Sequence, residues 1–219
     1  MVWTIPNILT VLRLLAAPAV VVMFLYFDRP WADWFALILF VSAAITDWFD
    51  GYLARLWKQT TKLGTMLDPI ADKAMVVIAL MVITGFSGMD PWFLLPATVI
   101  MFREIFVSGL REFLGDTAGT LKVTKLAKWK TTAQMIAIAV LFATGLFEHN
   151  ILNRTQGMDA QIVDDIFAGR VTDDVGLIWN FYAREVTWWS GVVLLWLAAI
   201  LTLVSGFDYF RKSRPYLKD

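Results

Sequence analysis

Hydrophobic and polar positions alternate along this chain in long blocks. Each apolar block holds about 20 residues, which is enough for a helix to cross the hydrocarbon core of a bilayer. Spanning segments are helices or closed barrels, and these blocks are too long and continuous for barrel strands. The pattern predicts an all-α polytopic membrane protein, a six-transmembrane-helix bundle with an N-terminal amphipathic stretch. The six predicted spans are 8–27, 33–56, 66–86, 91–113, 128–147 and 186–207.

Composition supports lipid as the surrounding solvent. Of the 219 residues, 58% are hydrophobic and 17% are charged, whereas a soluble domain of this size needs more polar surface. The formal net charge of zero gives no indication of a nucleic-acid partner. The chain has no Cys and a single His149, so thiolate and His-cluster metal sites are excluded. No Lys or Arg precedes Arg13, so we expect the first segment to be retained rather than cleaved, and 1–219 to form one domain.

Lys and Arg gather at one set of predicted helix ends. These ends carry Arg55, Lys58, Lys62, Lys122, Lys125, Lys128, Lys130, Arg211, Lys212, Arg214 and Lys218. The opposite connections carry Arg29, Arg154, Arg170 and Arg184. The positive-inside rule predicts that the first set and both termini are cytoplasmic. The long acidic connection at 149–185 is then external, with a short surface helix expected at 159–168, and its sequence indicates no chemistry.

Four carboxylates lie near the predicted cytoplasmic ends of the second and third spans. Asp47 and Asp50 are three residues apart, so they share one helical face. Asp68 and Asp72 are four residues apart and do the same. If the two helix ends face each other, the four carboxylates converge, and one or two hard divalent cations would remove their repulsion. We therefore predict a Mg²⁺ or Mn²⁺ site formed by these four residues.

Small residues accompany these carboxylates. Gly51 and Ala54 follow Asp47 by four and seven positions, so they leave a shallow groove on its face that a flat nucleotide base could enter. Gly64 precedes Asp68 by four and could clear room on the opposite helix. Arg55 adds a guanidinium that can contact phosphate in a fork geometry. The predicted nucleotide-binding residues are Asp47, Gly51, Ala54, Arg55, Gly64 and Asp68.

The aspartates have two other interpretations. They could form ordinary helix-end ion pairs with Arg55, Lys58, Lys62 and Lys73. For one aspartate near a membrane surface that interpretation is the better one, but four at these spacings beside small residues favour a site. A transporter relay would instead need acidic groups near the middle of several helices, and here they cluster at one end.

The same residues match the pattern D-x2-D-G-x2-A-R-x8-G-x3-D-x3-D, from Asp47 to Asp72, at every fixed position. By this pattern the chain resembles the CDP-alcohol phosphotransferase family. Segments 5–13, 66–73, 103–112 and 125–131 look like the phosphatidylglycerophosphate synthase branch of that family. The resemblance covers about 4–147 and returns weakly at 203–209.

The resemblance implies transfer of a phosphatidyl group from CDP-diacylglycerol to sn-glycerol 3-phosphate, with release of CMP. It also implies that Asp72 is the general base, and that Asp47, Asp50 and Asp68 are metal and nucleotide ligands. A homodimer in a bacterial-type inner membrane, among membrane lipids, is implied in the same way. Serine, an inositol phosphate or phosphatidylglycerol as acceptor stays open, as does a non-enzymatic transporter or scaffold.

An anionic acceptor needs cations on the cytoplasmic side. Arg103 and Arg111 lie about two turns apart on the fourth predicted span, roughly on one face, and Lys128 and Lys130 begin the fifth. Such residues can serve topology alone, but Arg103 lies deeper in an apolar run, which favours a functional role. We predict that these four residues bind the acceptor's phosphate.

Overall fold

The computed structural model describes residues 4–57, 61–120 and 125–217; the side chains at 6, 44, 47–57, 116, 120 and 125–128 are not among those it describes. Within these ranges the chain is helical and contains no strand, which confirms the all-α prediction. The helices are α1 (Ile5–Tyr26), α2 (Arg29–Trp57), α3 (Lys62–Phe86), α4 (Pro91–Leu114), α5 (Lys125–Thr155), α6 (Ala160–Phe167) and α7 (Leu177–Ser213). Two short 3-10 helices, Gly115–Thr120 and Arg214–Tyr216, follow α4 and α7.

Side-chain caps explain where several of these helices begin. The hydroxyl of Thr61 accepts a hydrogen bond from the backbone N–H of Gly64 at 3.0 Å, so α3 begins four residues before the predicted span. Asp90 caps α4 by accepting from the backbone N–H of Trp92 at 2.8 Å, with Pro91 in the first turn. α1 begins directly after its cap, Thr4. The described part of the N-terminal stretch is therefore the first turn of α1, and Met1–Trp3 lie outside the described residues.

Four helical segments of the described chain are long and apolar enough to cross a membrane: Asn7–Tyr26, Pro91–Leu114, Trp129–Thr155 and Leu177–Tyr216. They indicate an integral membrane protein and agree with four of the six predicted spans. α2 and α3 contain 29 and 25 residues, but neither is among these apolar segments. Both helices carry charged residues near one end. These are Asp47, Asp50 and Arg55 in the last turns of α2, and Lys62, Asp68, Asp72 and Lys73 in the first turns of α3.

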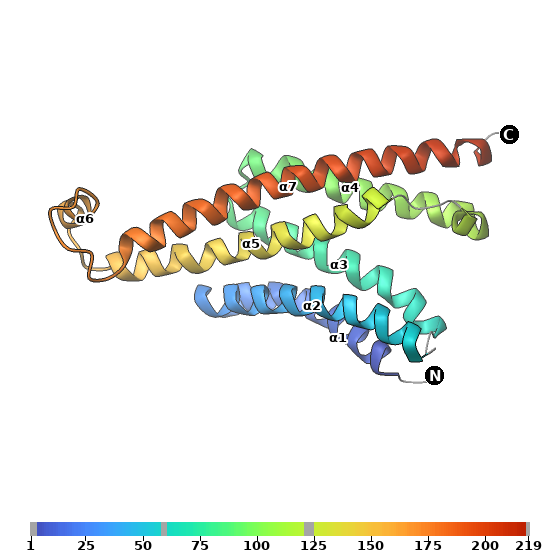
Figure 1. Cartoon of the computed structure of the whole chain (residues 1–219), viewed down its shortest axis with the longest axis horizontal. Coiled ribbons are helices and arrows are strands. Elements are labelled where there is room, and N and C mark those ends of the chain that lie inside the picture. Colours follow the sequence, from blue (N-terminus) through green and yellow to red (C-terminus); the bar gives the residue numbers. More distant parts are fainter. Residues whose placement is uncertain (1–3, 58–60, 121–124, 218–219) are drawn as a thin grey trace.

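The longest interface of the bundle runs between α5 and α7, which lie side by side, with α4 along α7 and α1 against α3 (Figure 1). Both chain termini lie at one end of the bundle and α6 at the other (Figure 1). Small residues let the long helices approach closely, as they do in membranes. Gly191 of α7 is one, because a Cβ there would lie 2.7 Å from Cγ of Leu141 on α5. Fully buried core residues include Ala36, Phe40, Ala79, Leu80, Ile100, Ile138, Leu195 and Ala198.

The polar connection between α5 and α7 is more helical than its composition suggests. α5 continues to Thr155 and α7 begins at Leu177, and the helix predicted at 159–168 is present as α6. The Asp173 carboxylate accepts hydrogen bonds from the backbone N–H groups of Leu177 and Ile178 at 2.7 and 2.9 Å. Desolvation raises the pKa of Asp173, but these backbone hydrogen bonds outweigh it, and its pKa lies below the usual value. The start of α7 is therefore capped by a carboxylate.

The close contact at Gly191 generates a stability prediction. Gly191→Ala should lower the thermal midpoint of the detergent-solubilised protein, because overpacking a filled interface costs about 1–3 kcal/mol. Gly109→Ala is the matched control, since a Cβ at Gly109 on α4 meets nothing within 4 Å. The control should keep or raise the midpoint, because Ala is the better helix former. Equal midpoints for the two variants would contradict the packing described for α5 and α7.

Candidate functional site

Two of the four predicted aspartates, Asp68 and Asp72, lie one turn apart on α3 and are engaged by side chains of α1. The hydroxyl of Thr10 donates to Oδ1 of Asp68 at 2.6 Å. Nη1 of Arg13 donates to Oδ1 of Asp72 at 3.2 Å, and its Nη2 lies 3.8 Å from Oδ1 of Asp68. The Arg13 side chain is 7% exposed, whereas those of Asp68 and Asp72 are 51% and 44% exposed. A nearly buried cation therefore holds two carboxylates that stay open to a ligand.

Arg13 was not predicted as a site residue. The sequence suggested Lys62 or Lys73 as ion-pair partners, but the ion pairs described for Asp68 and Asp72 are with Arg13. A signal was available, because Thr10 and Arg13 are three residues apart and both are polar within an apolar run. Polar groups within a membrane helix are a default indication of function.

Gly64 serves the contact between α3 and α1. A Cβ at Gly64 would lie 2.7 Å from Oδ1 of Asn7, and that oxygen accepts a hydrogen bond from Thr61 at 2.8 Å. Gly64 and Asn7 are both buried. Gly64 therefore lets Asn7 of α1 approach α3 closely. The prediction that Gly64 clears room beside the nucleotide groove stays a prediction.

The α2 part of the predicted metal and nucleotide site is described at the level of the backbone. Asp47, Asp50, Gly51, Ala54 and Arg55 lie in the last three turns of α2, but their side chains lie outside the described residues. Convergence of the four carboxylates stays a prediction. Within the described part of the chain, no group of three or more His, Cys, Asp or Glu side chains could hold a metal ion.

The described half of the predicted ligand set fits a divalent cation in its donor chemistry. Asp68 and Asp72 offer hard carboxylate oxygens, which suit Mg²⁺ or Mn²⁺. Both side chains are about half exposed, so a cation can reach them. Arg13 offsets only part of their charge, because one guanidinium faces two carboxylates.

A cavity of about 230 Å³ with several charged side chains in its lining opens beside Asp72, between α3, α4 and α5. Its charged lining residues are Asp72, Lys73, Arg103, Glu104, Arg111 and Lys130, and its uncharged polar ones are Ser108, Thr131 and Gln134. The structure thus brings the predicted base together with three of the four predicted phosphate-binding cations. The fourth, Lys128, has a side chain outside the described residues.

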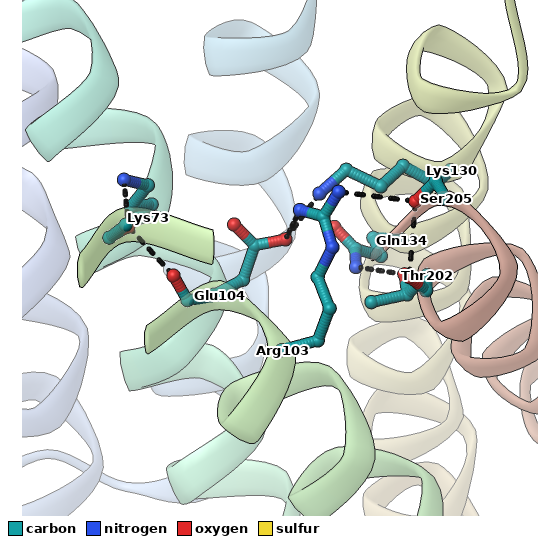
Figure 2. Close-up of polar contacts among 8 residues, drawn as sticks. Lys73, Arg103, Glu104, Lys130, Gln134, Thr202 and Ser205 are labelled. Carbon is teal, nitrogen blue, oxygen red and sulfur yellow. Dashed lines mark hydrogen bonds and ion pairs between the residues drawn. The ribbon is translucent and has the colours of Figure 1, made fainter. Parts of the chain in front are cut away.

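Glu104 is the centre of the charged network in this cavity (Figure 2). Nη1 of Arg103 donates to its Oε1 at 3.1 Å, and the ammonium of Lys130 donates to the same oxygen. The side chains of all three are no more than 12% exposed. One carboxylate therefore holds together a cation from α4 and a cation from α5. Neither the predicted spans nor the motif spacing indicated this pairing.

Lys73 and Ser108 continue the polar lining on the α3 side of Glu104. The ammonium of Lys73 donates to the hydroxyl of Ser108, which in turn donates to the backbone carbonyl of Glu104 at 2.7 Å. Lys73 follows Asp72 directly in the sequence, yet it bonds to α4 rather than to an aspartate of its own helix. The alternative interpretation, in which Lys73 pairs with an aspartate, therefore does not hold among the described contacts.

The net charge of the cavity suits an anion. Four cationic side chains and two carboxylates line it, which leaves a formal charge of +2. A phosphate monoester carries nearly two negative charges near neutral pH. Charge-assisted hydrogen bonds from Arg and Lys to a phosphate are stronger than hydrogen bonds between neutral groups. The cavity therefore offers a matched site for a phosphate group beside a carboxylate.

A second cavity, of about 70 Å³, lies among Phe24, Phe86 and the ion pair of Arg29 with Asp33. Nε and Nη2 of Arg29 donate to the two oxygens of Asp33 at 3.1 and 3.3 Å, so the carboxylate is engaged on both sides. The rings of Phe86 and Phe24 flank the guanidinium at 4.6 and 5.7 Å. Arg29 and Asp33 both belong to α2, and the guanidinium packs on rings from α1 and α3, so this pair contributes to the contacts among the three helices.

Comparison with known proteins gives consistent matches over the whole chain. The family model described as CDP-alcohol phosphatidyltransferase matches residues 3–204. A Cereibacter sphaeroides protein named CDP-diacylglycerol–glycerol-3-phosphate 3-phosphatidyltransferase is 65% identical over 219 residues, which cover 99% of this chain and 98% of that protein. Proteins of the same name from Salmonella choleraesuis and Escherichia coli are 36% and 35% identical over 221 residues, with all of both chains covered.

The network around Glu104 generates a prediction about stability. Glu104→Gln should lower the thermal midpoint, because it leaves the largely buried cations Arg103 and Lys130 without their carboxylate; unpaired buried charges cost about 3–5 kcal/mol. Adding inorganic phosphate should restore part of the loss. Glu112→Gln, at an exposed site on the same helix, is the control and should leave the midpoint unchanged. A wild-type midpoint for Glu104→Gln would contradict the central role of this carboxylate.

Proposed function

The chain belongs to the CDP-alcohol phosphatidyltransferase family, and from this we propose that it transfers a phosphatidyl group from CDP-diacylglycerol to sn-glycerol 3-phosphate. The products are phosphatidylglycerophosphate and CMP, so the chain is a transferase of phospholipid biosynthesis. The shared name of relatives that match the full chain supports the activity. The observation in the structure that carries the assignment is the cationic cavity in which Asp72 lies beside Arg103, Arg111 and Lys130.

On the donor side, Asp47, Asp50, Asp68 and Asp72 would hold a divalent cation, Mg²⁺ or Mn²⁺. When bound, such a cation supplies Lewis-acid stabilisation of the charge that grows on the diphosphate. Gly51, Ala54, Arg55 and Gly64 complete the proposed nucleotide site. Arg13 orients two of the carboxylates, since its guanidinium contacts both Asp68 and Asp72.

Asp72 is the proposed base. The hydroxyl oxygen of the acceptor attacks the phosphorus that bears diacylglycerol, its proton passes to the Asp72 carboxylate, and the bond to CMP breaks with its electrons on CMP. A carboxylate is a weak base, so it takes the proton late, as the new oxygen–phosphorus bond forms. Asp72 suits this role because its side chain lines the cavity and is 44% exposed.

The phosphate of glycerol 3-phosphate is the proposed ligand of Arg103, Arg111, Lys128 and Lys130. Its charge would offset the formal +2 of the cavity lining. Serine carries no such group, so it would leave the net positive charge of the lining without a counter-anion. With its phosphate bound by these cations, the acceptor would direct its reacting hydroxyl, at the other end of the molecule, toward Asp72 and the donor.

We also propose that α2 and α3 cross the membrane, which gives six spans. With 29 and 25 residues they are about 43 and 37 Å long, more than the roughly 30 Å of the hydrocarbon core. Most Lys and Arg lie at the predicted helix ends on the side of the two termini, which the positive-inside rule assigns to the cytoplasm. Both termini lie at one end of the bundle (Figure 1), so this end is the proposed cytoplasmic end. A homodimer in a bacterial-type inner membrane completes this proposal, on the family resemblance.

A CMP-release assay on purified protein with CDP-diacylglycerol tests this function. Release should require glycerol 3-phosphate, fail with serine, stop with a chelator and return with Mg²⁺ or Mn²⁺. Asp68→Ala should lower the rate by orders of magnitude because it removes a proposed metal ligand. Asp174→Ala, in the connection before α7, is the control and should keep the wild-type rate. Full activity in chelator would contradict the metal site, and release with serine alone would contradict the acceptor.

A further inference from the structure

One buried face of α7 packs against the cavity's arginines. This face consists of Thr202 and the residues three, four and seven positions after it, which are Ser205, Gly206 and Tyr209. Residues at these spacings share one side of a helix. All four are buried. None of them lines the cavity, and three of them lie beyond residue 204, where the match to the family model ends.

This face holds Arg103 at two points. The stem of Arg103 lies against Gly206, where a Cβ would come within 2.8 Å of its Cγ and 3.2 Å of its Nε. The guanidinium is held through Nη2, which donates to the hydroxyl of Ser205 at 3.2 Å (Figure 2). Since Nη1 is bound to Glu104, contacts on both sides fix the guanidinium plane.

The hydroxyl of Ser205 is set up to accept. It donates its own proton to the backbone carbonyl of Thr202 at 3.0 Å, which leaves its lone pairs for Arg103. The hydroxyl of Thr202 accepts from Nε2 of Gln134 at 3.0 Å, so the same turn of α7 also fixes a cavity-lining amide of α5 (Figure 2). The chain of contacts runs from α7 to side chains on both walls of the cavity.

Arg111 is held by the next turn of the same face. Its guanidinium lies 5.2 Å from the centroid of the Tyr209 ring, within the range of a cation–π interaction. Tyr209 is 6% exposed, and its buried hydroxyl has no hydrogen-bond partner among the described residues. The ring, rather than the hydroxyl, is therefore what Tyr209 offers to Arg111.

We propose that Ser205, Gly206 and Tyr209 of α7 are positioning residues that hold Arg103 and Arg111 ready for the acceptor's phosphate. The proposal rests on the proposed function. Arginine side chains have many rotamers, and holding them in place before the ligand arrives removes an entropy loss from binding. The positioned contact acts on the bound phosphate, away from the reacting atoms. Its loss should weaken acceptor binding without slowing the chemical step.

Steady-state kinetics of CMP release, with glycerol 3-phosphate and donor varied separately, test the proposal. Ser205→Ala, Gly206→Ala and Tyr209→Leu should each raise the KM for glycerol 3-phosphate about three- to tenfold, while kcat and the donor KM stay within about twofold. Arg103→Ala sets the upper limit, at about ten- to a hundredfold. Tyr209→Phe keeps the ring and should keep the wild-type KM.

The controls separate positioning from folding. Gly109→Ala meets open space, and Ser190→Ala removes an exposed hydroxyl that bonds to its own helix, so both should match wild type. An unchanged acceptor KM in the three α7 variants would overturn the proposal. So would a fall in kcat and thermal midpoint with no selective rise in acceptor KM. Absence of glycerol 3-phosphate-dependent CMP release in the wild-type protein would instead overturn the proposed function, before any variant is compared.

Discussion

Charged side chains inside a helical membrane bundle must be neutralised by their neighbours, because lipid solvates them poorly. In this chain Glu104 meets that constraint for Arg103 and Lys130, which come from α4 and α5. The pairing leaves the cavity with more positive than negative charge, so it stays receptive to an anion. The interaction that stabilises the bundle thus also prepares a phosphate site, and the remaining features of the cavity depend on it.

Helices that do not line the cavity contribute to it from outside. Arg13 of α1 engages the two carboxylates of α3, and α7 engages the two arginines of α4. Each contact orders a side chain that the proposed reaction uses: Asp72 as base, Arg103 and Arg111 as phosphate ligands. A rigid frame of this kind is what precise positioning of a ligand requires.

The sequence predicted those features that follow from local pattern. Apolar length predicted helices, and spacing predicted that Asp68 and Asp72 share a helical face; the structure agrees on both points. The apolar run around Arg103 favoured a functional role for it, and the structure shows that Arg103 is buried. It did not predict that Arg13 pairs with Asp72, because they are 59 positions apart and the pairing depends on how α1 packs on α3. Glu104 was missed for the same reason, since its second cation, Lys130, comes from another helix 26 positions away. Gly64 shows the limit most clearly: its small size was predicted to matter, but only the packing showed that α1 fills the space.

The account's central claim is that Asp72, although placed among the proposed metal ligands, acts chiefly as the base on the acceptor inside this cavity, whereas donor binding depends chiefly on the other three aspartates. The most direct test measures turnover and CDP-diacylglycerol binding, in the presence of Mg²⁺, for Asp72→Asn and Asp68→Asn. Asp72→Asn should abolish turnover and leave donor binding mostly intact, because the amide cannot take the proton. Asp68→Asn should weaken donor binding as well. Equal loss of donor binding in the two variants would contradict the claim and make Asp72 chiefly a ligand.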